Sequence, residues 1–231
     1  MKTKNLKQPT HRREFLGTLA AGAATLGLAA VSSPFKSEAM PGTDTPSEPD
    51  AWFKRITGKH KVVHDTPHPH DIFPFAWPRV FLMTNSRTGT PETDCSVVVV
   101  LRHSAIGYAF ESRLWEAYKF GEMFKADDPA TKLPALRNPF QKPQPGEFKV
   151  PGIGEVAIGI NQLQESGVMF CVCDMAMTVY SAVTAEAMKK DAAAVKTDWA
   201  GGLLPGIQIV PSGVWALGRA QEHGCAYIFA G

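Results

Sequence analysis

The stretch Ser96-Val-Val-Val-Val-Leu101 places five apolar residues in succession, and four of them are β-branched valines. The stretch Val168-Met-Phe-Cys-Val-Cys173 has the same unbroken apolar character. Runs of this kind, without alternating polar residues, are typical of strands that are buried on both faces of a parallel sheet. The two stretches therefore predict the centre of a parallel sheet that helices cover on both sides.

Shorter strands and the connecting helices can be placed outward from these two runs. Further strands are predicted at 61–63, 207–210 and 226–229. Helical spacing of apolar residues, with Ser104 as a candidate N-cap and Gly224 as a candidate C′ residue, predicts the helices. They span 76–84, 104–124, 155–165, 175–188 with an alanine-rich continuation to about 195, and 213–223. Residues 127–152 contain six prolines, which predict a long irregular excursion.

Strands and helices alternate throughout this region. The alternation predicts an α/β protein with a parallel sheet and helices on both faces. Because crossovers between parallel strands are right-handed, few topologies remain. We expect a flavodoxin-like, doubly wound, five-stranded parallel sheet with a strand order such as 2-1-3-4-5.

The N-terminal region has the features of an export signal. Residues 10–17 read THRREFLG, in which the pair Arg12-Arg13 precedes a Phe-Leu dipeptide, and this resembles the twin-arginine export consensus. The apolar run at 17–31 is about 15 residues long, as in signal-peptide cores, and is short of the roughly 20 residues that span a bilayer. Small residues predict cleavage after Ala39. The alternative is an uncleaved N-terminal anchor.

These features divide the chain into three predicted segments. They are a twin-arginine signal peptide at 1–39, a flexible N-terminus at 40–58 and one folded domain at 59–231. The protein is expected to be exported to the periplasm, with the twin-arginine export machinery as a partner. No later segment is apolar enough to span a bilayer, so we expect no stable membrane span after cleavage.

The charge balance argues against nucleic-acid binding. The full chain has a formal charge of +2, but residues 40–231 carry 18 basic and 20 acidic side chains, a charge of −2. The basic character therefore belongs mostly to the signal. Nucleic-acid binding needs a clustered basic face, which a nearly neutral domain does not indicate.

A site is expected beyond the carboxyl ends of the strands, where ligands bind in doubly wound sheets. Polar and reactive side chains follow the predicted strands at that edge. They include the histidine-rich segment 64–71, Arg102 with His103, Cys173 with Asp174, and Ser212. We expect Thr66, Asp174 and Ser212 to contribute to ligand binding there.

Cys173 is the candidate reactive residue because it lies where a strand gives way to a helix. The dipole and free N–H groups of a helix N-terminus favour a thiolate. Asp174 acts in the opposite direction, since a neighbouring negative charge raises the pKa of a thiol. The alternative is that Cys171 and Cys173 are small buried hydrophobic residues.

Cys171 and Cys173 are two positions apart on one strand, so they are predicted to share a face. An extended chain separates their Cα atoms by roughly 6.6 Å, near the upper limit for a disulfide. A bond between them would be strained and reducible, as in a redox pair.

The densest group of histidines offers an alternative metal site. His64, His68 and His70 lie close in the sequence, and His103 follows the next strand. Histidine, cysteine and aspartate are common ligands of zinc and copper. His68 and His70, in an extended segment flanked by prolines, are expected to point to the same side. The alternative is a solvated loop in which the histidines have no common function.

Arg102 and His103 end a buried strand. One interpretation is a pair that binds an anion or activates a thiol. The other is that Arg102 is structural and pairs with an acidic residue elsewhere.

The C-terminal third resembles the DsrE/DsrF-like family. The resemblance rests on Gly167–Cys173, on Leu203–Val214 with its strand and Pro-Ser-Gly turn, and on Ala220–Ile228. Val97–His103 also resembles the second strand of that family. The resemblance covers roughly residues 60–231. It implies a flavodoxin-like sheet, a homo-oligomer such as a trimer or hexamer, and in some members a persulfide-carrying cysteine, whose position Cys173 matches.

Several features depart from that family. They are the export signal, the Cys-x-Cys pair, the proline-rich excursion, and Cys225 where the family usually has tyrosine. The sequence therefore predicts an exported branch and a carrier or binding protein rather than a turnover enzyme. Its expected role is a thiol or persulfide sulfur carrier, or a small-ligand binder, with Cys173, His103 and Arg102 at the site. The alternative is a periplasmic zinc or copper protein.

Overall fold

The structure is a computed structural model, and it describes residues 49–231. The predicted signal peptide and the first part of the predicted flexible segment lie outside the described residues.

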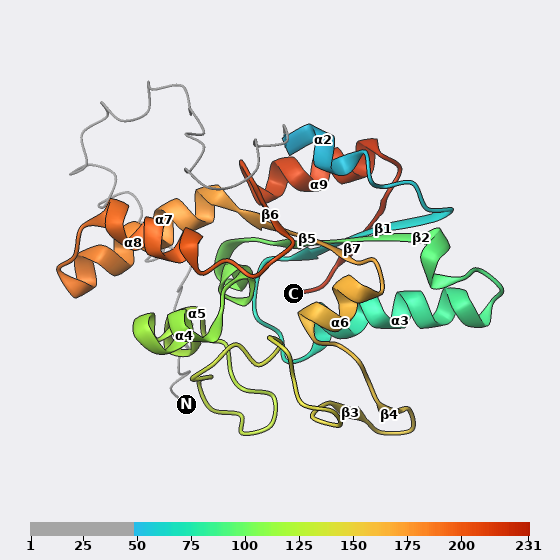
Figure 1. The fold of residues 1–231 in the computed structure, drawn as a ribbon, viewed down its shortest axis with the longest axis horizontal. Helices are drawn as coiled ribbons and strands as arrows, with labels where there is room; N and C mark the ends of the chain where they lie inside the picture. Colours follow the sequence, from blue (N-terminus) through green and yellow to red (C-terminus); the bar gives the residue numbers. More distant parts are fainter. Residues whose placement is uncertain (1–48) are drawn as a thin grey trace, which may run out of the picture. The chain divides into compact units, whose positions relative to one another are not determined.

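A five-stranded parallel sheet forms the centre of the described region (Figure 1). Its strand order is β6-β5-β2-β1-β7, and every neighbouring pair is parallel. The strands are β1 (His60–Thr66), β2 (Cys95–Leu101), β5 (Met169–Cys173), β6 (Ile207–Val210) and β7 (Ala226–Phe229). The predicted α/β fold class with a five-stranded parallel sheet is confirmed.

The strand order differs from the expected 2-1-3-4-5. In chain order the sheet reads 4-3-2-1-5, because the chain adds four strands in one direction and then returns to lay β7 beside β1. Both orders obey the right-handed crossover rule, so sequence patterns do not distinguish them. The reversal places the topological switch point between β5 and β6, since α7 (Asp174–Met188) and α9 (Gly213–Glu222) leave these strands toward opposite faces.

Two apolar layers enclose the sheet, and the residues of β2 alternate between them. Val97 and Val99 join one core cluster, whereas Val98 and Val100 join the other. Helices α2 and α9 cover one face, and α3 and α6 lie on the other (Figure 1). Their bounds are Pro49–Phe53 for α2, Phe73–Arg87 for α3 and Ile160–Glu165 for α6. The unbroken apolar run of β2 thus reflects burial on both faces.

Part of the segment predicted to be flexible is packed. Trp52 and Phe53 of α2 are buried, and so is Ile56. The Phe53 ring lies edge-on to Trp52 and to Trp215 of α9, with ring centroids 4.9 and 5.7 Å apart. This aromatic contact offsets the polar composition that suggested a loose chain.

The single helix expected at 104–124 is three shorter pieces. They are the 3-10 helix η3 (His103–Ala109), α4 (Ser112–Tyr118) and α5 (Phe120–Phe124). The first break follows from Phe110, which is extended and pairs with Leu203. The second follows from Lys119, whose φ of 52° is left-handed. Ser104 lies inside η3 and does not cap a helix.

Other elements also begin or end at residues that differ from the prediction. The antiparallel pair β3 (Lys149–Val150) and β4 (Gly154–Glu155) shortens the helix expected at 155–165 to α6. The alanine-rich continuation is a separate helix, α8 (Ala192–Gly201). It is separate because Lys189 is left-handed and the Asp191 side chain accepts a hydrogen bond from the backbone N–H of Ala194. The helix η2 (Glu92–Asp94) precedes β2.

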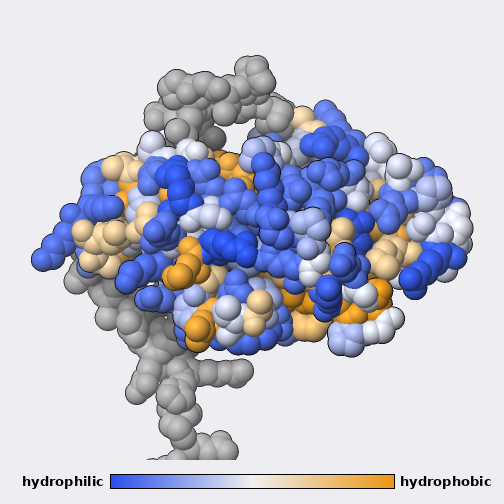
Figure 2. Space-filling view, turned by 60° about the horizontal axis from the view of Figure 1, so that its bottom comes forward, coloured by the Kyte–Doolittle hydropathy of each residue, from blue (hydrophilic) through white to orange (hydrophobic). Residues whose placement is uncertain are grey.

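The surface is mixed. The face drawn in Figure 2 is mostly hydrophilic and is interrupted by several apolar patches. Within residues 49–231, no helix combines the length and the apolar character that crossing a bilayer requires.

Candidate functional site

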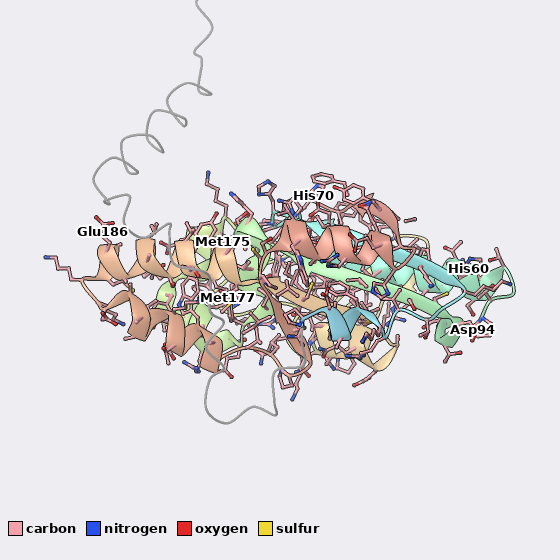
Figure 3. The ribbon with its side chains drawn as sticks, turned by 90° about the horizontal axis from the view of Figure 1, so that it is seen from above. His60, His70, Asp94, Met175, Met177 and Glu186 are labelled. Atoms are coloured by element: carbon pink, nitrogen blue, oxygen red, sulfur yellow. The ribbon has the colours of Figure 1, made fainter. Side chains whose placement is uncertain are left out.

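The carboxyl ends of the parallel strands meet at one end of the sheet. Figure 3 shows His60 and Asp94, near the starts of β1 and β2, at one end, and Met175, near the start of α7, further along toward the other. The backbone N–H of Met175 donates to the Pro211 carbonyl at 3.3 Å, which joins the ends of β5 and β6. The residues expected to form the site can be located from this edge.

An ion pair between Arg102 and Asp65 lies at this edge. Arg102 donates through Nε to Oδ1 of Asp65 at 2.6 Å and through Nη2 to Oδ2 at 2.9 Å. The Tyr227 hydroxyl donates to the same Oδ2 at 2.7 Å. Asp65 is 2% exposed. The interpretation that Arg102 pairs with an acidic residue is therefore the observed arrangement, and the buried carboxylate receives three hydrogen bonds.

The backbone of Cys173 lies beside that of Arg102, because Leu101 pairs with Val172 in the β2–β5 register and these are the next residues. The Arg102 side chain packs against α9, whereas Cys173 packs in the core cluster on the other face. The Cys173 sulfur accepts a hydrogen bond from the backbone N–H of Ala176 at 3.3 Å, and it thereby caps α7. Hydrogen bonds to Asp65 are the main cause that raises the pKa of Arg102, and Cys173 adds a smaller contribution.

The N-terminus of α9 closes the other side of Arg102. A Cβ atom added to Gly213 would lie 2.5 Å from the Cβ of Arg102, so only glycine permits this approach. The Ser212 hydroxyl caps α9 by accepting from the Trp215 N–H at 3.2 Å. Arg102 thus lies between Asp65 on one side and the start of α9 on the other.

His103 extends this group toward solvent. Its φ of 48° is left-handed, and its ring lies edge-on to that of His68, with centroids 5.0 Å apart. The Tyr180 hydroxyl of α7 lies 3.4 Å from both ring nitrogens of His103. Burial lowers the pKa of His103, and the charges of His68 and Arg102 lower it further. At neutral pH the imidazole is therefore uncharged.

All four cysteines are free thiols, and Cys171, Cys173 and Cys225 are buried. Burial raises the pKa of Cys171 far above its usual range and raises that of Cys225 to about 11. Burial, with Asp94 and Glu92 nearby, also raises the pKa of Cys95. Each of these thiols stays protonated near neutral pH.

The expectation that Cys171 and Cys173 share a face was wrong. Cys171 packs in the core cluster under α9, whereas Cys173 packs in the cluster on the opposite face. Cys173 leaves the alternation of the strand because its backbone already turns into α7 as the N-cap.

The structure does not gather the predicted metal ligands. His64 is buried within β1, His68 lies against His103 and Ser104, and the His70 ring packs 5.0 Å from that of Phe73. His68 and His70 therefore have different surroundings, contrary to the shared side that was expected. Within residues 49–231, no three histidine, cysteine, aspartate or glutamate side chains are placed to share one metal ion.

The three residues expected to bind a ligand have local partners or are buried. Asp174 pairs with Lys196, with Nζ 2.8 Å from Oδ1. Ser212 is the α9 cap described above. Thr66 is fully buried, and its hydroxyl has no partner among the described residues.

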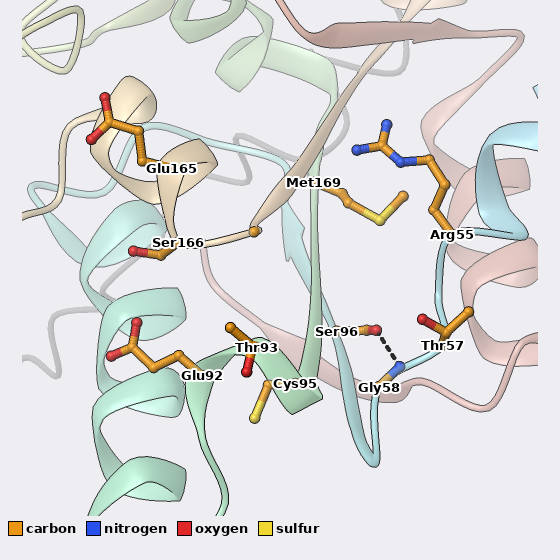
Figure 4. A pocket seen from close by; sticks show the side chains of 11 residues that line it. Arg55, Thr57, Gly58, Glu92, Thr93, Cys95, Ser96, Glu165, Ser166 and Met169 are labelled. Carbon is orange, nitrogen blue, oxygen red and sulfur yellow. Dashed lines mark hydrogen bonds between the residues drawn. The ribbon is translucent and has the colours of Figure 1, made fainter.

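A cavity that the sequence did not indicate lies at the other end of the sheet, near the starts of β2 and β5. Its volume is about 540 Å³, and Figure 4 shows Cys95, Glu92 and Arg55 among the side chains that line it. The Ser96 hydroxyl in its wall accepts from the Gly58 N–H at 2.8 Å. Because its thiol is protonated, Cys95 is a poorer nucleophile than a thiolate would be.

Comparisons with known proteins give one weak structural similarity to report. No protein-family model matches the chain, and no curated protein sequence matches it significantly. A solved structure described as a protein of unknown function, MTH1491 from Methanobacterium thermoautotrophicum, is similar at 15% identity with a TM-score of 0.38. The match covers 74% of this chain and 99% of the other. A similarity of this size identifies neither a family nor an activity.

Proposed function

We propose that the chain carries sulfane sulfur as a persulfide on Cys173, as the resemblance to the DsrE/DsrF-like family implies. The observation that supports this most is the position of Cys173 at the N-terminus of α7. Of the four thiols, only Cys173 accepts a hydrogen bond from a backbone N–H at a helix N-terminus. That N–H and the helix dipole stabilise negative charge on sulfur.

The proposed reaction exchanges one sulfur–sulfur bond for another. The Cys173 thiolate attacks the terminal sulfur of a donor persulfide, R–S–SH. A bond forms between Sγ and that sulfur, the bond to the donor sulfur breaks, and the electron pair leaves with R–S⁻. The products are the Cys173 persulfide and the donor thiolate, so no external oxidant or reductant is needed.

His103 is the proposed proton acceptor for Cys173. It follows Arg102 directly in the chain, and its lowered pKa leaves the imidazole neutral and able to accept a proton. Tyr180 and His68 hold the ring from two sides.

The test is sulfur uptake by the full chain from glutathione persulfide, measured by mass spectrometry as the gain of one sulfur atom and mapped by peptide analysis. We expect the parent to load at Cys173 and the variant Cys173→Ser to lose loading. The matched variants Cys95→Ser and Cys225→Ser should load as the parent does. The proposal fails if Cys173→Ser takes up sulfur as readily as the parent.

We also propose that the chain is exported by the twin-arginine route, on the basis of the Arg12-Arg13 motif. The double variant Arg12→Lys/Arg13→Lys should stay in the cytoplasm, whereas the parent should appear in the periplasmic fraction. Equal periplasmic amounts of the two proteins would exclude this route.

Self-association is proposed from the resemblance, and the edge strand β7 supports it. Its four residues are all exposed, and Tyr227, Ile228 and Phe229 are 38–55% exposed. An edge strand with apolar side chains is a surface that proteins usually cover.

A further inference from the structure

A second cavity, of about 230 Å³, lies between the segment that follows β1 and the proline-rich excursion. His70 and Asp71 line it from one side, and Lys125, Asp127 and Asp128 line it from the other. Tyr108 of η3 forms part of its wall. None of the residues proposed for sulfur transfer line this cavity, so what it binds is independent of that function.

Tyr108 presents an unpartnered polar group to this cavity. The residue is 1% exposed, and its ring packs edge-on against Phe75 and Phe140 at 5.2 and 5.3 Å. The Asn138 amide donates to the Tyr108 carbonyl at 2.9 Å and so fixes the backbone. No hydrogen bond joins the Tyr108 hydroxyl to another described residue. Unlike the Thr66 hydroxyl, it is not completely enclosed, so a ligand in the cavity can reach it.

Tyr108 shares the cavity with acidic groups. Burial raises the pKa of Tyr108 well above the usual range, and the charges of Asp71 and Asp127 raise it further. The phenol is therefore neutral at physiological pH. It can accept one hydrogen bond from a ligand and donate another.

The carboxylates of the cavity differ in how they are used. Asp71 pairs with Lys132 at 2.9 Å, and Asp128 accepts from the N–H groups of Ala130 and Thr131. The Asp127 side chain forms no ion pair or hydrogen bond with any described residue. Asp127 and the Tyr108 hydroxyl are thus an available anion and an available acceptor in the same cavity.

We infer that this cavity binds a small organic cation through an ammonium group, which donates to the Asp127 carboxylate and to the Tyr108 hydroxyl. The volume is below the roughly 300–1,000 Å³ of pockets for drug-sized ligands, so the ligand is a short amine. A bare metal ion fits less well, because no three acidic, histidine or cysteine side chains of the described residues converge. An ammonium does not need three side chains around one point, because each of its three N–H groups can donate to a separate acceptor.

The test is binding of 1,4-diaminobutane to the full chain by isothermal titration calorimetry. 1,4-Butanediol and magnesium chloride serve as the uncharged and metal probes. We expect saturable binding of the diamine alone. Tyr108→Phe keeps the ring packing and removes only the hydroxyl, and Asp127→Asn removes only the charge. Each should weaken binding about tenfold, the size typical of losing a hydrogen bond to a charged group.

Asp94→Asn is the matched control, because Asp94 is an exposed aspartate of η2 outside this cavity, and it should bind as the parent does. Circular dichroism checks that each variant is folded. If Tyr108→Phe does not fold, the affinity of Asp127→Asn for the diamine decides the test. The inference is overturned if the diamine does not saturate, if the diol or magnesium binds as well, or if Asp127→Asn leaves the affinity unchanged. Sulfur loading at Cys173 is measured in a separate experiment. A failure of the sulfur-carrier proposal would therefore leave the diamine-binding result unchanged.

Discussion

Arg102 and Asp65 form a two-point ion pair across neighbouring strands, and the carboxylate is almost completely buried while the guanidinium reaches solvent. Removing the cation from Asp65 would lower the stability of the fold strongly, because a buried unpaired charge is far less stable than a hydrated one. The Arg102 side chain also packs against Gly213, and the Arg102 backbone lies next to that of Cys173. Arg102 therefore links the stability of this end of the sheet to the strand that carries the proposed sulfur site.

We expect Arg102→Met to lower the free energy of unfolding by about 3–5 kcal/mol, because it leaves Asp65 buried without its cation. Urea denaturation at pH 7 measures this. Arg137→Met breaks the exposed pair between Arg137 and Glu147 and should cost no more than about 1 kcal/mol. Equal losses in the two variants would show that burial of Asp65 does not matter.

We expect the two usual cysteine replacements to differ at position 173. A serine hydroxyl can still accept from the Ala176 N–H as an N-cap, whereas Cys173→Ala leaves that donor without its cap. The alanine variant should therefore be less stable than the serine variant by about 1 kcal/mol, measured by thermal and urea unfolding. Identical stabilities would mean that the sulfur does not cap α7 in solution.

We expect the chain to self-associate through β7, and Phe229→Lys to weaken this by placing a charge on the edge strand. Sedimentation velocity over a concentration series gives the mass of each species. Leu136→Lys introduces the same charge at another exposed apolar residue, in the proline-rich excursion, and should associate as the parent does. A monomeric parent at all concentrations would contradict the prediction.

The strands were predictable because their signal is local. The valines of β2 and the apolar run of β5 specify burial on both faces whatever the strand order. The helix at 104–124 was not, because its first break depends on contacts with distant residues. Phe110 is held extended by its pairing with Leu203, and the Asn138 amide binds the carbonyls on either side of that break.

The site was predicted in part. The sequence indicated that Arg102, His103 and Cys173 share one end of the sheet, since all lie where parallel strands end. Tyr227 was missed because the expected order would have put β7 at the far edge from β1, whereas the observed order places it beside Asp65. The Tyr108 cavity was missed because its walls come from an excursion that carries no periodic signal.

We expect His64 to make the protein sensitive to acid. Its ring is 1% exposed on β1, between Val99 and Ile228 of the adjacent strands, and neither ring nitrogen has a partner among the described residues. Burial lowers the pKa of His64 from 6.5 to about 4. The unfolded chain therefore takes up a proton below about pH 6.5, while the folded chain does not until about pH 4.

This difference favours unfolding as the pH falls. The stability that neutral His64 contributes is fully present above pH 6.5 and is lost through the window down to pH 4, by about 3 kcal/mol in all. His64→Leu should remove that dependence, and at pH 7 it should cost little, because two unsatisfied nitrogens disappear from the core. His60→Leu, at the half-buried start of the same strand, is the control and should keep the acid dependence. Urea unfolding at pH 7, 5.5 and 4.5 measures all three proteins. If the parent and His64→Leu lose stability in parallel, groups other than His64 set the acid limit, and its burial is compensated by a partner such as an internal water that binds both ring nitrogens.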